Sequence, residues 1–248
     1  MTSLPERSGS RRGARKRLRN IGILLLIAAV PMGLFGGAAS AAAVAREARS
    51  VSGFDRIVLR GVGDLAIRQG DRESLVVEAE TRILRNLSAT VSNGTLYLDV
   101  IGNVSTQQPI RYELTVKTLR EVLSEGSGAV ELAAIRSASL ALTLGGSGEI
   151  KAAALRVSRL ESSIAGSGSI TTDGEAGEQS VRIGGAGDYF AEELRTHAAS
   201  IDISGPGSAR VRVRDTLKVR ISGSGNVTYP GNPRVAQDIS GAGDVTRE

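Results

Sequence analysis

Side chains that could carry out chemistry are scarce in this sequence of 248 residues. It contains no cysteine, which excludes disulfides, thiolate nucleophiles, cysteine zinc sites and iron–sulfur clusters. Its one histidine, His197, excludes an imidazole metal cluster within one chain and is the only base for a Ser–His–Asp triad. His197 lies in the polar stretch Arg195-Thr-His-Ala-Ala-Ser200, where a solvated corner between strands is the simpler interpretation.

A second route to catalysis would use carboxylates, of which the sequence offers a group in its last third: Asp188, Glu192, Glu193, Asp202 and Asp215. Two carboxylates across a groove are the machinery of glycoside hydrolysis. Such sites usually also have sugar-stacking aromatic residues and long loops, for which the sequence offers Tyr189, Phe190 and the polar stretch 171–179, expected to be a long corner loop. We predict that the protein is not an enzyme and has neither catalytic residues nor a cofactor. The alternative is a polysaccharide-active lyase or hydrolase on a β-helix.

A short phrase recurs along the chain: an aliphatic residue, a spacer, Gly-x-Gly, and a small or acidic residue. The paired glycines of its eight copies are Gly61 and Gly63, Gly126 and Gly128, Gly146 and Gly148, Gly166 and Gly168, Gly185 and Gly187, Gly205 and Gly207, Gly223 and Gly225, and Gly241 and Gly243. From Gly126 onward the first glycines are 20, 20, 19, 20, 18 and 18 residues apart. Spacing this regular indicates stacked structural repeats.

The residue after each Gly-x-Gly is predicted to form a column: Asp64, Ala129, Glu149, Ser169, Asp188, Ser208, Asn226 and Asp244. Oxygen ligands one coil apart could bind Ca²⁺, and the candidates are Asp64, Glu149, Asp188 and Asp244. Because half of the column is Ala, Ser or Asn, we favour corner capping through hydrogen bonds to the backbone, and we predict no metal site. No copy has the pattern of a phosphate-binding loop. The glycines are therefore interpreted as structural corners that need a positive φ.

Short segments of alternating aliphatic residues precede the glycines, as in Val181-Arg-Ile183, and this period is that of a β-strand. No repeat has room for a convincing helix. We therefore predict an all-β protein, a single-stranded parallel β-helix or β-solenoid of about eight coils, with two or three strands and 18–20 residues in each coil. A propeller would need a period of about 40 residues. A transmembrane barrel would need aromatic girdles, and only six aromatic residues follow position 45.

The sequence divides into three parts. Residues 1–45 hold seven basic groups and then an uncharged stretch from Ile21 to Ala45, which predicts either a signal peptide cut near Ala41 to Ala45 or an uncleaved membrane anchor. Residues 46–248 are predicted to form the solenoid, with 54–120 as an antiparallel N-terminal cap and first coils and 121–248 as regular Gly-x-Gly coils. The Asn93-Gly94 pair, between two alternating runs, predicts a hairpin in the cap.

The net charge of the chain is +5, but the excess lies in the first part. Residues 46–248 have 24 basic and 25 acidic residues, a net charge of −1, so we predict no nucleic-acid partner.

The stretch from Phe54 to Asp71, with Asn93-Gly-Thr-Leu96 and the later Gly-Ser-Gly ladder, resembles the bacterial "putative auto-transporter adhesin, head GIN domain" family. The similarity extends from about residue 51 to the end. It implies an exported, right-handed parallel β-helix, and the family name implies adhesion.

These observations predict a non-enzymatic, exported cell-envelope module with a binding or structural, adhesin-like role. Its partner would be an envelope protein or a glycan, and its location the periplasm or the cell surface. A membrane-tethered envelope sensor or scaffold is a further alternative, with contact to the inner membrane only through residues 21–45 if these are not cleaved. The last coil has no cap in the sequence, which predicts a homo-oligomer through that end.

Overall fold

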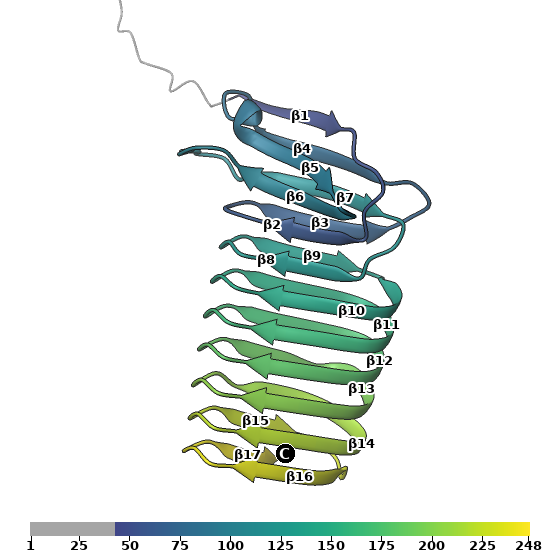
Figure 1. Ribbon diagram of the computed structural model, residues 1–248, viewed down its shortest axis with the longest axis vertical. Coiled ribbons are helices and arrows are strands. Elements are labelled where there is room, and N and C mark those ends of the chain that lie inside the picture. The colour runs from purple at the N-terminus through teal and green to yellow at the C-terminus, as the bar shows by residue number, and fades with distance from the viewer. Residues whose placement is uncertain (1–42) are drawn as a thin grey trace, which may run out of the picture. The chain divides into compact units, whose positions relative to one another are not determined.

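Alternating aliphatic residues build strands that point every second side chain into a common core. The computed structural model describes residues 43–248, and Figure 1 shows their strands stacked in layers. The strands of the regular coils are β8 (Glu121–Ser124), β9 (Ala129–Ala133), β10 (Arg136–Leu144), β11 (Glu149–Ile164), β12 (Ser169–Ile183), β13 (Asp188–Ile203), β14 (Ala209–Ile221), β15 (Asn226–Tyr229), β16 (Arg234–Ile239) and β17 (Asp244–Arg247). The predicted segment 1–42 lies outside the described residues.

Each coil pairs in parallel with the coils before and after it, which confirms the β-solenoid. Ile164 pairs with Ile183, Ile183 with Ile203, Ile203 with Ile221, and Ile221 with Ile239. These offsets agree with the predicted 18–20 residues per coil. The first four isoleucines are at most 1% exposed and stack in one column, and burying each contributes about 1.5–3 kcal/mol.

The long strands bend, so that each regular coil has three sides. In β11 the inward alternation breaks at Ala153-Ala154 and again at Ser158-Arg159, where neither residue of the pair is buried. The first side follows the Gly-x-Gly corner, the second lies between the two breaks, and the third leads to the next Gly-x-Gly. A register shift between Ala152 and Leu155 marks the corner between the first and second sides.

The Gly-x-Gly corners stack on one another through their backbones. A Cβ atom on Gly146 would overlap the carbonyl oxygen of Gly126, and the same overlap recurs at each later corner glycine. The prediction that these glycines need a positive φ is wrong: within residues 43–248 only Gly61 and Gly63, of the sixteen, have one. Close approach of backbones from neighbouring coils, and not a left-handed conformation, excludes a side chain at the other corners.

The second corner has the conformation that was expected at the first. Ala134, Ala154 and Gly174, which lead into the second side, have φ angles of 55°, 53° and 110°. Left-handed alanines are uncommon because the Cβ crowds the backbone. The Asp173 carboxylate supports this corner by accepting a hydrogen bond of 2.6 Å from the Ala154 backbone N–H.

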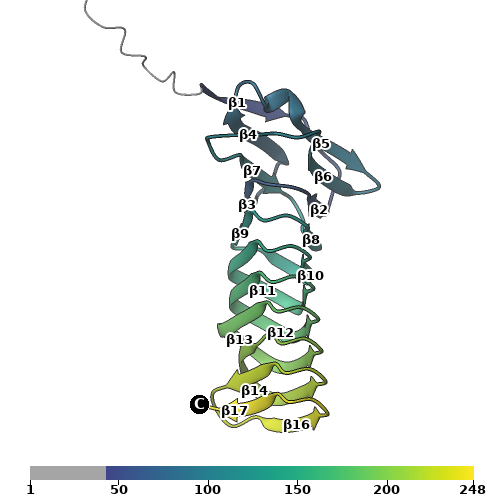
Figure 2. The ribbon, with the colours of Figure 1, turned by 90° about the vertical axis from the view of Figure 1, so that its left-hand side faces the viewer.

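The N-terminal part forms the predicted antiparallel cap above a first coil. Its elements are β1 (Val44–Arg49), β2 (Arg56–Leu59), β3 (Asp64–Gln69), β4 (Ser74–Glu80), η1 (Leu84–Asn86), β5 (Leu87–Ser92), β6 (Thr95–Val100) and β7 (Arg111–Val116). Strands β6 and β7 lie parallel to β2 and β3. Strands β5, β4 and β1 then add antiparallel pairs. Figure 2 shows this cap above the regular coils. Asn93 and Gly94 turn the β5–β6 hairpin with φ angles of 50° and 75°, as predicted.

A buried carboxylate ties the cap together. The Glu80 side chain is 1% exposed and accepts hydrogen bonds from the backbone N–H groups of Gln107 and Gln108 and from the Thr106 hydroxyl, and it forms a 2.7 Å ion pair with Arg82. These contacts, that with Gln107 first, lower the Glu80 pKa to about 2, against the opposing effect of burial.

We expect a Glu80→Gln variant to be less stable than the wild type at pH 7, with a difference that disappears in acid. The unfolded carboxyl has a pKa of 4.5 and the folded one about 2, so the stabilisation is complete above about pH 4.5 and is lost as the pH falls toward 2. Urea unfolding of both proteins from pH 2 to pH 7 measures this. A difference that is constant over the whole range would contradict it.

A second buried polar group lies inside the regular coils. The Tyr189 hydroxyl donates to Gln179 Oε1 at 3.1 Å and lies 3.2 Å from Thr172 Oγ1. Gln179 Nε2 donates to Thr196 Oγ1 at 3.0 Å, and the Thr196 hydroxyl donates to the Arg212 carbonyl at 2.9 Å. Burial raises the pKa of Tyr189. The four side chains (Thr172, Gln179, Tyr189 and Thr196) thus satisfy one another within an aliphatic core.

Candidate functional site

The second side of the regular coils is hollowed into a groove with a volume of about 810 Å³. Strands β10 to β14 contribute its lining: Ser137, Arg156, Val157, Ser158, Glu175, Ala176, Gly177, Arg195, Thr196, His197, Arg212, Val213 and Arg214. We call this surface the arginine groove. Alternation along each strand points one lining residue inward and its two neighbours outward.

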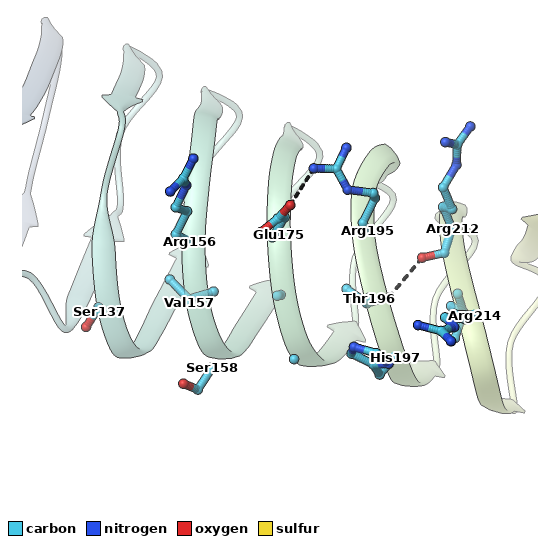
Figure 3. A pocket seen from close by; sticks show the side chains of 13 residues that line it. Ser137, Arg156, Val157, Ser158, Glu175, Arg195, Thr196, His197, Arg212 and Arg214 are labelled. Atoms are coloured by element: carbon cyan, nitrogen blue, oxygen red, sulfur yellow. Dashed lines mark hydrogen bonds and ion pairs between the residues drawn. The ribbon is translucent and has the colours of Figure 1, made fainter.

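The groove has two edges and a floor (Figure 3). Arg156 pairs with Glu175 and Glu175 with Arg195 in the ladder, and Arg212 continues this edge on β14. Ser158, His197 and Arg214 lie along the opposite edge. The floor consists of residues that are at most 7% exposed: Val157, Ala176, Thr196 and Val213. Small floor residues keep the groove open along the stacking direction.

The charge of the groove is mainly positive, with four arginines and one glutamate in its lining. Arg195 donates a hydrogen bond to Glu175 and lowers the pKa of that carboxyl. Arg214 lies 3.6 Å from Asp215. Within the described part of the chain, Arg156 and Arg212 form no ion pair. Their guanidinium groups are thus available to an anion.

His197 lies at the groove edge and contacts one carboxylate. Its Nδ1 is 3.0 Å from Asp215 Oδ2, and both side chains are more than half exposed. No hydroxyl forms a hydrogen bond with His197 among residues 43–248. The His–Asp half of a triad is therefore present without a serine, and the corner position agrees with the solvated interpretation.

The other candidates for polysaccharide chemistry do not come together. Asp188 accepts a hydrogen bond from the Ser208 backbone N–H on the first side, Glu192 lies 3.7 Å from Arg210 beyond it, and Asp202 lies on the third side. Glu193 lies at the exposed corner between the first and second sides.

The predicted aromatic and loop features also differ. Tyr189 is fully buried and cannot stack on a sugar, because it belongs to the core column of its coil. Phe190 remains partly exposed with the Arg210 guanidinium 5.7 Å from its ring centre. The prediction of a long loop at 171–179 is wrong, since β12 runs through it and only Gly174 interrupts the register.

The column after the Gly-x-Gly corners is present, and its side chains bind backbone. Asp64 accepts a hydrogen bond of 3.1 Å from the Ala129 N–H, and Asn226 accepts one of 3.1 Å from the Asp244 N–H, each from the following coil. Glu149 instead pairs with Lys151 at 2.8 Å. In the column Ala129, Ser169 and the pair Ser208 and Asn226 separate the carboxylates, so no two are adjacent. Among residues 43–248 no three His, Cys, Asp or Glu residues gather as a metal site.

The arginine groove is the feature that sequence reasoning missed. Its signal was present: Arg136, Arg156, Arg195 and Arg212 occupy one outward position of successive coils, apart from the coil of Glu175. Recognising it requires the number of residues in each side of the coil, which differs between coils and shifts the spacing.

With the fold and the groove described, comparison with known proteins places the chain. The family model described as "Putative auto-transporter adhesin, head GIN domain" matches residues 53–233. The chain belongs to this family. The match covers the cap and nearly all the regular coils of this head GIN domain. None of the curated proteins matches the chain.

Solved structures share the fold of this head GIN domain. A structure described as a putative adhesin from Bacteroides fragilis has a TM-score of 0.77 at 19% identity, covering 83% of this chain and 97% of its own. A putative adhesin from Parabacteroides distasonis has a TM-score of 0.70 at 25% identity, with the same two coverages. Another protein from that organism, described as a putative lipid binding protein, has a TM-score of 0.68 at 22% identity, covering 83% and 96%. These three names describe no enzyme.

Proposed function

We propose that the chain is an exported, non-enzymatic adhesin-like module of the cell envelope that binds its target through the arginine groove. Membership of the head GIN domain family supports the adhesin-like role. The groove carries the proposal, because it is the largest hollow on the described surface and spans strands from β10 to β14. Its lining comes from strands of a stacked scaffold, which holds the binding side chains in place without loops.

An enzymatic role has less support in the structure. The carboxylates on which it depends lie on different sides of the coil, and the His197–Asp215 pair has no hydroxyl partner among residues 43–248. The structural neighbours described above have adhesin and lipid-binding names. Binding without product formation is therefore the expected behaviour toward a polysaccharide or a protein target.

Binding and turnover measured together test this function. The full chain is incubated with purified envelope polysaccharides and envelope proteins, and both the bound fraction and any change in target size are recorded. We expect saturable binding with intact targets. Shortened polysaccharide products would instead support the lyase or hydrolase alternative, and an absence of binding to every target would refute the adhesin-like role.

Export is part of the proposal, and the start of the fold bears on it. Strand β1 begins at Val44, at the end of the uncharged segment 21–45. Just before it, the carbonyl of Ala43 accepts hydrogen bonds from the Thr81 backbone N–H at 2.8 Å and from the Thr81 hydroxyl at 3.1 Å. Within residues 43–248, no helix is long and apolar enough to span a bilayer.

We expect the mature protein to begin at Ala42. Among the three matching cleavage positions, a cut after Ala41 keeps β1 and its contact with Thr81, whereas a cut after Ala43 or Ala45 removes that contact. Intact mass measurement of the protein from its native cells gives the position. A mass that includes the whole N-terminal segment would support the membrane-tethered alternative instead.

A second copy of the chain remains a possible partner in this proposal. All six residues of β16 are exposed, and Val235 and Ile239 are each 37% exposed. Strand edges of this kind pair readily with other strands. Association of two copies through β16 and β17 stays a prediction.

A further inference from the structure

We propose that the ligand of the arginine groove is an extended acidic polysaccharide, bound through its carboxylates along the stacking direction. The inference rests on the proposed binding function and adds the chemical class of the ligand. It follows from the charge, the shape and the donor types of the groove, taken in turn below.

The charge of the groove is a local feature. Residues 46–248 together have a net charge of −1, yet the groove lining holds four arginines and one acidic residue. The hollow around the column after the Gly-x-Gly corners has the opposite character, with Asp64, Glu149 and Asp188 and no basic residue in its lining. A concave surface of one sign focuses the field on a ligand of the opposite sign. The groove thus selects anions, and the first side does not.

The shape of the groove suits a linear polymer. Five successive strands, β10 to β14, cross it, and neighbouring strands lie about 4.8 Å apart, so the groove is roughly 19 Å long. Its floor of Val157, Ala176 and Val213 offers apolar contact to the C–H groups of a sugar ring. A flat membrane surface could not follow this concave floor with the same charges.

The donors are side chains with forked geometry. The floor residues pair in the parallel ladder, Val157 with Ala176 and Ala176 with Thr196, so the strand backbones bond to one another. Recognition then depends on guanidinium groups, whose paired N–H donors match a carboxylate in a bidentate arrangement. Arg156 and Arg212 have no ion-pair partner in the described chain, which makes them the main contacts.

Glu175 gives the groove a charge pattern and not uniform positive charge. It lies between Arg156 and Arg195 in the ladder and pairs with Arg195. A polymer with a charge on every unit would meet this carboxylate as a repulsive site. Removing the Glu175 charge should therefore strengthen the binding of a densely charged polymer, in the opposite direction to the arginine substitutions.

The experiment measures binding of the full chain to polygalacturonate by calorimetry at low salt, with its fully methyl-esterified form as the matched neutral polymer. We expect saturable binding to the acid form, no binding to the ester, and a steep loss of affinity as salt is added. Arg156→Gln and Arg212→Gln should each weaken binding about three- to tenfold, and Glu175→Gln should strengthen it. Arg182→Gln, an exposed arginine on the third side, is the control and should change nothing.

Circular dichroism and thermal unfolding verify that the variants are folded, and the exposed positions make this the expected result. Equal binding of the ester, equal losses for Arg182→Gln and Arg212→Gln, or equal affinity for polyphosphate or phosphatidylglycerol vesicles would each overturn the inference. If the chain binds other envelope targets with unchanged affinity in the arginine variants, the adhesin-like function stands and the assignment of groove and ligand fails.

Discussion

A Gly146→Ala variant is expected to lose at least about 3 kcal/mol of folding free energy, and the full chain carrying it should unfold at a much lower urea concentration. The added Cβ would overlap the carbonyl oxygen of Gly126 in the preceding coil. Neither backbone can move alone, because both coils are held by the ladders on either side of the corner. The strain must therefore open the stack or break ladder hydrogen bonds.

The adjacent glycine provides a matched control. A Cβ on Gly145 would have the Ser124 carbonyl oxygen as its nearest neighbour, at 3.8 Å, which is ordinary contact. Gly145→Ala should thus be neutral or slightly stabilising, since alanine restricts the unfolded chain. Equal urea midpoints for the two variants would show that the backbone stacking described above does not require glycine.

A Tyr189→Ala variant is expected to lose about 3–5 kcal/mol, because it empties the position of a large, fully buried aromatic ring. Tyr189→Phe isolates the hydroxyl and should cost about 1–3 kcal/mol, since it leaves Gln179 Oε1 without its donor inside the core. Chemical denaturation of the two variants separates the contribution of the ring from that of the hydrogen bond.

A double-mutant cycle with Gln179→Leu checks that interpretation. If the hydroxyl acts through Gln179, then Tyr189→Phe should cost less in the Gln179→Leu background than in the wild type. Costs that simply add would mean that the Tyr189 hydroxyl stabilises the protein through other contacts, such as that with Thr172.

Periodicity and turn chemistry carried most of the fold prediction. The nearly constant glycine spacing determined the coil length because one parallel coil must return each column residue to the same place, as Ile183 and Ile203 do. The Asn93-Gly94 hairpin was predictable because few residue pairs adopt two successive positive φ angles. Both signals are local or strictly repeated, which is why sequence alone was sufficient.

The conformation of the corners was not predictable in the same way. Glycine marks both a positive φ and a close backbone approach, and the sequence does not distinguish these two causes. The close approach involves an atom of another coil, as between Gly146 and Gly126, and so depends on the stacking itself. The positive φ angles fall on Ala134 and Ala154, where the sequence gives no sign of them.

The arginine groove depended on the side lengths within each coil. Arg156, Arg195 and Arg212 are separated by 39 and 17 residues, and neither number is a multiple of one period. Coils of different length bring them to one edge because the shorter coil of β14 omits residues between the first and second sides. Only the ladder register shows that they are neighbours.

The stacking of coils has a mechanical consequence for a protein held at two points. Each regular coil is bonded only to the coils on either side, so tension along the stack acts on one interface at a time. A released coil of 18–20 residues could extend to roughly 60–70 Å, against about 4.8 Å when stacked. The molecule would lengthen in discrete steps under shear and absorb work at each, which would let an attachment to the envelope yield before it breaks.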